Sequence, residues 1–378
     1  VSKHYRGLQG LIKSRGISVV EGNGRLAGPG AIDVDGGEQV TAAAVVLASG
    51  SYARSLPFIP IDGDVFVVSD HCLSMGEVPA SLIVIGAGAV GLEFASLYRS
   101  FGADVTVVEA LDRLAPGEDE EISKELARQF RKRKIEVFAG AKVKSAEVRD
   151  GGAAVEIETG GAAKTLTAQR CLVAVGRGPV SEGLGYEQAG VKVERGFVVV
   201  DENCRTGVDG VWAVGDLITQ PSLGLPFPHF QLAHVAFGEG IHVAEQITGV
   251  ETQPVDYAGV PRATYSEPEI ASVGLTEQQA AAAGHRVKTA KFNWAASGKA
   301  SILGEAGGFI KVVSAEGGAV LGVHMIGPRV TELISEAQLI TNWEALPDEV
   351  AALIHPHPTL SEGLGEAMLA LAGKPLHG

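Results

Sequence analysis

Residues 81–110 read SLIVIGAGAVGLEFASLYRSFGADVTVVEA. An apolar run, a glycine-rich turn, an amphipathic segment and a second apolar run follow one another, which predicts strand, tight turn, helix and parallel strand. Gly86, Gly88 and Gly91 form the pattern G-x-G-x-x-G directly after the first run. The stretch therefore predicts one βαβ unit of an α/β fold.

The three glycines and the acid that ends the second strand predict a dinucleotide site. The first glycine permits the tight turn, the second lets a pyrophosphate approach the backbone, and the third lets helix and strand pack closely. Glu109 lies 23 residues after Gly86, where an acid hydrogen-bonds an adenosine ribose and repels a 2′-phosphate. We therefore expect NAD rather than NADP. The alternative is a turn that only packs the βαβ unit, with Glu109 at a solvated strand end.

Composition bounds the class of protein. The 378 residues are enough for two or three domains, and the formal charge of −14 argues against binding to nucleic acid or to an anionic membrane. No apolar run is long enough to span a bilayer. Cys72, Cys171 and Cys204 are scattered without metal-type spacing, so we expect no metal site, a reducing cytoplasm, and buried or incidental thiols, with Cys204 in a surface turn.

The pattern changes near the last third of the chain. Apolar strands alternate with amphipathic helices up to about residue 255, which predicts parallel sheet. A hairpin is predicted at 143–161 and a charged amphipathic helix at 120–137. From about Pro261 alternating strands are followed by a helix at 330–342. We therefore expect an α/β region followed by an α+β domain.

Several separated motifs, in order, resemble the flavin-dependent pyridine nucleotide disulfide oxidoreductases. The motifs are VVLASGS (45–51), GAGAVGLEFA (86–95), AVGRGP (174–179), VWAVGD (211–216), LAHVAFGEG (232–240), YSEPEIASVGLTE (265–277) and HPHPTLSE (355–362). The form of the last motif, together with Glu109, favours the dihydrolipoyl dehydrogenase branch. The resemblance implies FAD and NAD as cofactors, a cytoplasmic homodimer, and oxidation of the lipoyl domain of a 2-oxoacid dehydrogenase complex or of a glycine-cleavage carrier.

The resemblance also implies a division of the chain. Doubly wound, Rossmann-like parts would comprise a partial FAD domain with the central region (1–76 and 197–255) and an NAD-binding domain (77–196). A C-terminal α+β dimerisation domain would occupy 256–378. The proline-rich stretch 216–231 is longer than is usual in the family, and we expect a surface loop there.

Cofactor residues follow from the same motifs. Asp216 resembles the acid that holds the flavin ribityl chain, and the helix beginning near Ala233 resembles one whose N-terminus faces the flavin. Gly50 and Gly176, in VVLASGS and AVGRGP, are expected among the cofactor-binding residues. Glu93 resembles an acid close to the nicotinamide and flavin rings, with an ion-paired or surface glutamate on a helix as the alternative.

His357 resembles the family's active-site base, and Glu362 the acid that orients it. A dithiol must lose a proton before it can attack a disulfide, and a neutral imidazole suits that task. A carboxylate on the other ring nitrogen fixes the tautomer. The alternative explains Glu362 as part of a capping box with Thr359, and the two roles are compatible. The preceding His355 is expected to be structural.

Two family features do not occur in this sequence: the first G-x-G-x-x-G, for the flavin ADP moiety, and a cysteine pair spaced C-x4-C. The resemblance then leaves three interpretations. The chain is a fragment of a longer enzyme, its N-terminal segment is a separate polypeptide, or it is a degenerate, non-catalytic NAD-binding and dimerising module. Another flavoprotein disulfide reductase is the alternative within enzymes.

Overall fold

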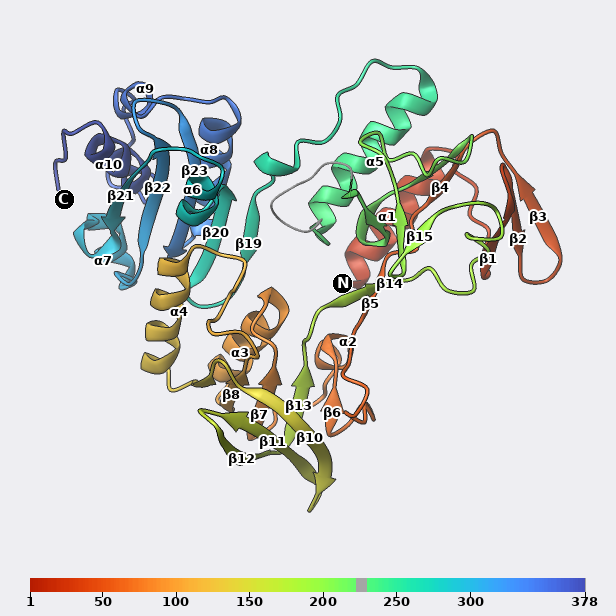
Figure 1. Cartoon of the computed structure of the whole chain (residues 1–378), viewed down its shortest axis with the longest axis horizontal. Helices are drawn as coiled ribbons and strands as arrows, with labels where there is room; N and C mark the ends of the chain where they lie inside the picture. The colour runs from red at the N-terminus through yellow and green to blue at the C-terminus, as the bar shows by residue number, and fades with distance from the viewer. Residues whose placement is uncertain (222–229, 378) are drawn as a thin grey trace. The chain divides into compact units, whose positions relative to one another are not determined.

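The computed structural model describes residues 1–221 and 230–377, so half of the predicted loop at 216–231 lies outside the described residues. Contacts group the described chain into two compact units (Figure 1). The first unit holds residues 1–51 and the described part of 179–255, and the second holds 52–178 and 256–377. The mixture of parallel and antiparallel sheets with helices confirms the predicted α/β class. The domain boundaries at 77, 197 and 256 stay predictions.

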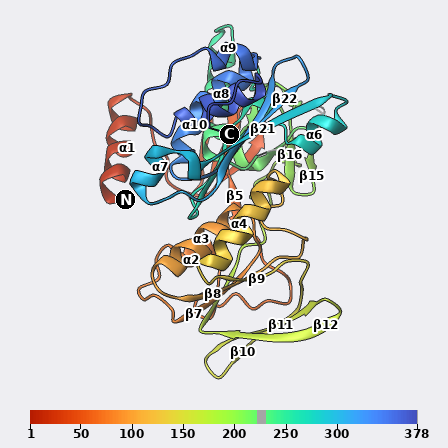
Figure 2. The ribbon, with the colours of Figure 1, turned by 90° about the vertical axis from the view of Figure 1, so that its left-hand side faces the viewer.

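A parallel sheet organises the first part of the second unit. Its strand order is β6–β13–β7–β8–β9. The strands are β6 (Phe66–Val67), β7 (Ser81–Ile85), β8 (Asp104–Val108), β9 (Glu136–Phe138) and β13 (Arg170–Val173). Helices α3 (Ala89–Ser100) and α4 (Glu120–Lys132) lie over one face, and an antiparallel ribbon lies over the other (Figure 2). The ribbon contains the predicted hairpin and consists of β10 (Lys142–Arg149), β11 (Gly152–Thr159) and β12 (Ala162–Ala168).

Strand β7 is apolar on both sides because both faces of the sheet are covered. Leu82 and Val84 belong to the core formed with α3 and α4. Ile83 and Ile85 belong to a separate core formed with the ribbon. The short helix α2 (Ser69–Cys72) packs beside β6 and β13.

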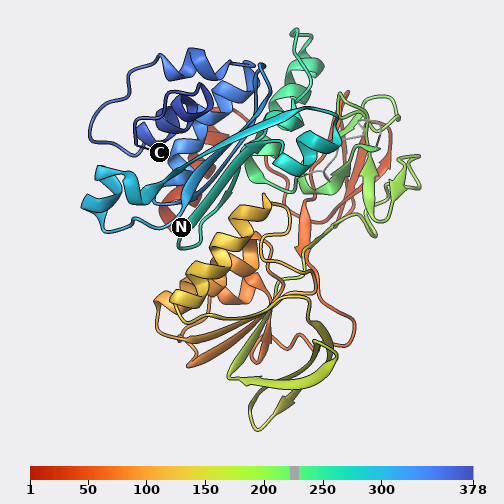
Figure 3. The same ribbon diagram turned by 60° about the vertical axis from the view of Figure 1, so that its left-hand side comes forward.

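The second part of this unit is an antiparallel sheet with helices packed on it (Figure 3). Its strand order is β19–β20–β23–β22–β21. The strands are β19 (Arg262–Thr264), β20 (Glu269–Gly274), β21 (Val287–Asn293), β22 (Phe309–Ala315) and β23 (Val320–Gly327). The helices are α6 (Glu277–Ala282), α7 (Gly298–Leu303), α8 (Val330–Asn342), α9 (Pro347–Ala351) and α10 (Glu362–Leu371). Helices α8 and α10 share one core with the sheet, and the histidine-bearing segment 352–361 connects α9 to α10.

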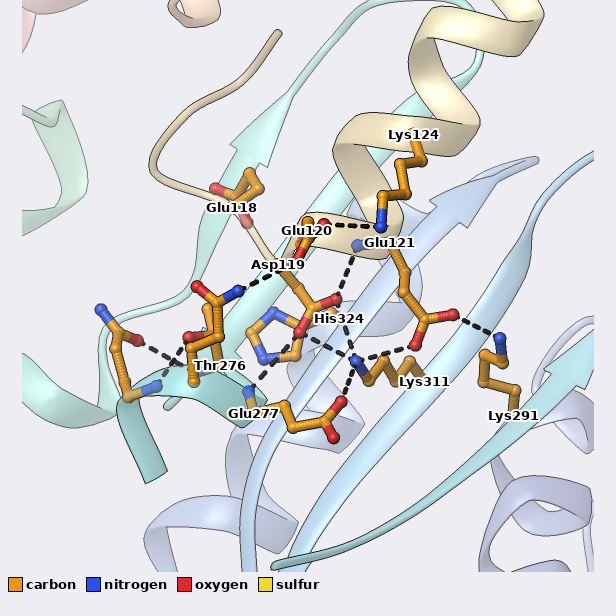
Figure 4. Close-up of polar contacts among 12 residues, drawn as sticks. Glu118, Asp119, Glu120, Glu121, Lys124, Thr276, Glu277, Lys291, Lys311 and His324 are labelled. Carbon is orange, nitrogen blue, oxygen red and sulfur yellow. Dashed lines mark hydrogen bonds and ion pairs between the residues drawn. The ribbon is translucent and has the colours of Figure 1, made fainter. Parts of the chain in front are cut away.

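A buried lysine joins these two parts (Figure 4). The Nζ atom of Lys311, on β22, lies 3.1 Å from Asp119 Oδ1, 2.9 Å from Glu121 Oε1 and 2.6 Å from Glu277 Oε2. Only 2% of the Lys311 and Asp119 side chains is exposed. Burial raises the pKa of Asp119, but the Glu121 N–H, His324 and Lys311 outweigh it and hold that pKa below its ordinary value. The same carboxylate caps α4 by accepting from Glu121 N.

A second carboxylate strengthens the junction. Glu118 accepts from Ser272 Oγ at 2.5 Å and from Arg262 Nε at 3.2 Å. Ile270 and Phe309 of the C-terminal sheet also belong to the core under α3 and α4. The two parts that the sequence predicts as separate domains therefore share both a hydrophobic core and a buried ionic cluster.

The first unit is built from short sheets and two long helices. Its three-stranded antiparallel sheet consists of β1 (Gly24–Gly28), β2 (Ala31–Val34) and β3 (Glu38–Thr41). The remaining strands are the parallel pair β4 (Val45–Leu47) and β17 (Val211–Ala213), and the sheet of β15 (Val193–Glu194), β16 (Phe197–Val199) and β18 (Ile218–Thr219). The helices are α1 (Ser2–Ser14) and α5 (Ala233–Thr248). Strand β5 (Ser51–Ala53) pairs with β14 (Arg177–Pro179).

Among the described residues, every helix is too short or too polar to cross a membrane.

Candidate active site and cofactor sites

The three glycines of the turn after β7 each have a distinct environment. Gly86 has φ +103°, and a β-carbon built on it would lie 2.3 Å from the carbonyl oxygen of Ala174. A β-carbon on Gly91 would lie 1.9 Å from the carbonyl oxygen of Gly86, so α3 packs directly on the turn. Gly88 precedes α3, and a β-carbon there would meet nothing within 4 Å. The turn therefore leaves room for a phosphate beside the backbone at Gly88, and the residues fit a dinucleotide.

Replacing Gly88 by alanine is expected to change NAD affinity, whereas replacing Gly91 is expected to change stability. Gly91→Ala places a methyl group against a backbone oxygen, so it should lower the unfolding temperature. Gly88→Ala has room for its methyl group and should leave the unfolding temperature unchanged, but it should weaken NAD binding at least tenfold by obstructing the pyrophosphate. Calorimetry and NAD titration of both variants check this. Unchanged NAD affinity in Gly88→Ala would contradict the assignment.

Glu109 lies against the same turn. Its side chain is 8% exposed, Oε2 accepts from Ala87 N at 2.6 Å, and Oε1 accepts from Leu111 N at 2.8 Å. The alternative of a solvated acid at a strand end is therefore wrong. Each oxygen keeps a further lone pair that can accept a ribose hydroxyl. Gly176, with φ +101°, follows β13 at the same carboxyl edge of the sheet, where Gly86 packs on the neighbouring Ala174.

Glu93 connects α3 to the C-terminal part. Its Oε1 accepts from Tyr265 N at 2.9 Å. Burial raises the pKa of Glu93, and the Tyr265 N–H opposes this only in part. The carboxylate of Glu93 is therefore partly buried and accepts a hydrogen bond from backbone, which the alternative of a surface or ion-paired glutamate does not describe. A role beside the cofactor rings stays a prediction.

The predicted flavin residues meet at one edge of the first unit. Gly50 and Asp216 each follow a strand of the parallel pair β4 and β17 by three residues, and such carboxyl ends are where ligands of α/β sheets bind. Ser51 Oγ donates to Asp216 Oδ2 at 2.5 Å. Gly50 has φ +72°, and a β-carbon there would meet nothing within 4 Å. Helix α5, which begins at Ala233, packs against the short 3₁₀ helix η1 (Gly215–Leu217) that carries Asp216. These residues fit part of a flavin nucleotide.

Sequence reasoning missed a buried acid in this region. Glu239, on α5, is fully buried and accepts from Gly215 N at 2.6 Å. Its position between two glycines in FGEG, on a predicted helix, could have indicated a close approach of backbone to that helix.

The two residues predicted as an acid–base pair are in contact. His357 Nδ1 lies 2.8 Å from Glu362 Oε1, and 79% of the His357 side chain is exposed. Glu362 Oε2 accepts from Thr359 N at 2.7 Å. Burial raises the pKa of Glu362, but the Thr359 N–H and the His357 ring outweigh it and hold that pKa below its ordinary value. With Nδ1–H donating to this carboxylate, Nε2 of His357 is the basic nitrogen that faces solvent.

Glu362 also makes one of the two hydrogen bonds of a capping box. It accepts from Thr359 N as a capping box requires. However, Thr359 Oγ1 bonds Pro356 O and Ser361 Oγ rather than the backbone of α10, which begins at Glu362. The carboxylate therefore serves the loop and the histidine together.

All three cysteines are buried thiols in the described part of the chain. Burial raises the pKa of Cys72 to about 11 and raises that of Cys171 further. Thiols in such surroundings are not ionised near neutral pH. Cys204 lies in the predicted turn, and its side chain is fully buried in the core of the first unit, with φ +58°.

Comparisons with known proteins cover nearly the whole chain. Residues 1–240 match the family Pyridine nucleotide-disulphide oxidoreductase, and residues 260–368 match its dimerisation domain. The chain is 42% identical over 392 residues to a dihydrolipoyl dehydrogenase of Bacillus subtilis, covering all of this chain and 81% of that protein. It is 39% identical over 376 residues to a dihydrolipoyl dehydrogenase of Mycobacterium tuberculosis, covering 97% and 78%.

Two solved structures are similar to this chain over nearly its whole length. LpdA from Mycobacterium tuberculosis superposes with a TM-score of 0.87 at 26% identity, covering 98% of this chain and 81% of that one. The HOCl-induced flavoprotein disulfide reductase RclA from Escherichia coli gives 0.83 at 25% identity, covering 93% and 79%. The chain therefore belongs to the pyridine nucleotide-disulphide oxidoreductase family of FAD- and NAD-dependent oxidoreductases, and its C-terminal part is the family's dimerisation domain.

Proposed function

We propose that this chain acts as a dihydrolipoyl dehydrogenase that oxidises a protein-bound dihydrolipoyl group with NAD. The observation that carries the proposal is the contact of 2.8 Å between His357 Nδ1 and Glu362 Oε1, on a histidine whose side chain is 79% exposed. A histidine oriented in this way can take a proton from a thiol. The relatives named dihydrolipoyl dehydrogenase support the choice of a dithiol as substrate.

The protein's part in this reaction is to bind, orient and move protons. FAD and NAD, when bound, supply the two-electron chemistry that converts the dithiol and NAD into a disulfide and NADH, with release of one proton. In the family that this chain resembles, one sulfur of the dithiol attacks the disulfide of a cysteine pair spaced C-x4-C and breaks its S–S bond, and that pair does not occur in this sequence. His357 Nε2 would accept the proton from the attacking thiol. Glu362, ionised because its pKa is low, stabilises the imidazolium and keeps the ring from turning over.

We assign one group of residues to NAD and another to FAD. We assign the turn of Gly86, Gly88 and Gly91 to the NAD pyrophosphate and Glu109 to its adenosine ribose. Two further residues, Gly176 and Glu93, are assigned to the same cofactor. Asp216, Gly50 and the helix beginning at Ala233 are assigned to FAD.

The partners belong to the same proposal. The dimerisation domain supports a homodimer. The substrate is the lipoyl domain of a 2-oxoacid dehydrogenase complex or of a glycine-cleavage carrier, because these carry the dithiol. A cytoplasmic location is consistent with three buried thiols that do not require an oxidising compartment.

A second candidate is another flavoprotein disulfide reductase, since the structure of RclA is also similar to this chain. Steady-state rates of the flavin-loaded enzyme separate the two. We expect dihydrolipoamide with NAD to be the fastest pair, and NADP to be at least tenfold poorer because Glu109 repels a 2′-phosphate. Reduction of another disulfide with NADPH at a higher kcat/KM would favour the second candidate.

A further inference from the structure

The ring of His357 is held weakly by its own surroundings. It is 79% exposed, and its Nδ1 contact with Glu362 fixes one edge of the ring. An exposed imidazole on a loop has little packing to set its position. The position of the base must therefore be set through the backbone of the segment that carries it.

Two residues upstream, His355 is held on two sides. Its Nε2 lies 2.8 Å from Glu336 Oε1 on α8, and 12% of its side chain is exposed. The opposite edge of the ring packs on α10, because a β-carbon on Gly365 would lie 2.7 Å from His355 Nδ1. The ring thus fills the space between a carboxylate on one helix and a glycine on another.

The connection between the two histidines is short and stiff. Pro356 separates them and fixes its own φ while restricting the residue before it. The Pro356 carbonyl oxygen accepts from Thr359 Oγ1 at 2.7 Å. The segment is therefore anchored before His357 by a side chain between α8 and α10, and after it by Thr359.

We propose that His355 and Glu336 form a positioning pair that fixes the backbone of residues 355–357 and so keeps His357 aligned on Glu362. The proposal rests on the proposed function only for its expected effect on kcat. Its expected effect on the orientation and tautomer of the His357 ring does not depend on the proposed function. A misplacement of about 1 Å can cost about a hundredfold in rate, so the pair matters without touching substrate.

The main test compares His355→Leu with His355→Gln in the flavin-loaded enzyme. His355→Leu should lower kcat for dihydrolipoamide about ten- to a hundredfold, with little change in the KM for NAD. His355→Gln keeps an N–H for Glu336 and should recover most of the rate. Histidine ¹⁵N spectra give a readout independent of turnover: His357 should lose its Nδ1–H tautomer in His355→Leu and keep it in His355→Gln.

Independent variants approach the pair from both helices. Glu336→Gln keeps an acceptor oxygen and should behave as the wild type, whereas Glu336→Leu should resemble His355→Leu. Gly365→Ala pushes on the ring from α10 and should also disturb the His357 tautomer. His377 lies 3.0 Å from Glu366, and 65% of its side chain is exposed. It provides a matched control, and His377→Leu should change neither readout.

A wild-type tautomer and kcat in His355→Leu would overturn the proposal. A lower unfolding temperature and kcat with an unchanged His357 tautomer would also overturn it, because His355 would then be structural only. Failure of the wild type to oxidise dihydrolipoamide would contradict the proposed function, while the tautomer measurement would still decide the positioning role.

Discussion

Replacing His357 by glutamine is expected to lower the turnover number for dihydrolipoamide by about 10²- to 10⁴-fold, the range that general acid–base catalysis contributes. Glutamine can still hydrogen-bond Glu362, but it cannot take a proton from a thiol. Since the side chain is 79% exposed, the substitution should leave the unfolding temperature unchanged. Steady-state kinetics with dihydrolipoamide and NAD, together with calorimetry, check both expectations.

The control for this variant is electron transfer from NADH to an artificial acceptor such as ferricyanide. That reaction requires no proton transfer from a dithiol, so His357→Gln should retain it. Glu362→Gln should lower dihydrolipoamide turnover less, because the base remains and only its orientation and charge stabilisation suffer. A His357→Gln enzyme with more than half of the wild-type turnover would refute the role of the base.

Replacing Lys311 by methionine is expected to destabilise the second unit by about 3–5 kcal/mol, the cost of removing one partner from a buried ionic cluster. Methionine fills a similar volume, but Asp119 and Glu277 would then lose the cation that they share, and Glu121 would keep only Lys291. The free energy of unfolding, followed by tryptophan fluorescence in urea, measures the loss.

Lys291→Met is the matched control. Lys291 also pairs with Glu121, but the two side chains are 43% and 35% exposed. Ion pairs of this kind contribute about 0–1 kcal/mol. Equal losses in the two variants would mean that burial of the Lys311 cluster adds nothing to its effect.

The pH dependence of stability supplies a second readout for the cluster. Because the pKa of Asp119 is lowered in the folded chain, its contribution is fully present above the unfolded value of about 3.9. The contribution is lost as the pH falls through the lower folded value. In Lys311→Met the carboxylate loses its cation, so the loss of stability on acidification should become shallower.

Local patterns in the sequence were enough to predict the features that depend on near neighbours. The separate roles of Gly86 and Gly91 follow from spacing, and the structure has both close contacts. The pair His357 and Glu362, five residues apart, is in contact. Helix α8 has the predicted bounds because its apolar residues repeat at helical spacing.

Features that depend on distant partners could not be predicted. Lys311 and Asp119 lie 192 positions apart, and a lysine in an apolar strand gives no indication of which acids it meets. His355, in the segment between α9 and α10, gave no signal for Glu336, which lies 19 positions away on helix α8.

Anaerobic rapid mixing with dihydrolipoamide, followed by visible absorption, tests the role of His357 most directly. The test uses the flavin-loaded enzyme as purified from its native source, because the cysteine pair spaced C-x4-C does not occur in this sequence. The wild type should bleach rapidly, and His357→Gln should bleach about 10²- to 10⁴-fold more slowly, while NADH should reduce both proteins at equal rates. Equal bleaching by dihydrolipoamide in the two proteins would contradict the assignment of His357 as the base. Absence of bleaching in the wild type would contradict the proposed function itself.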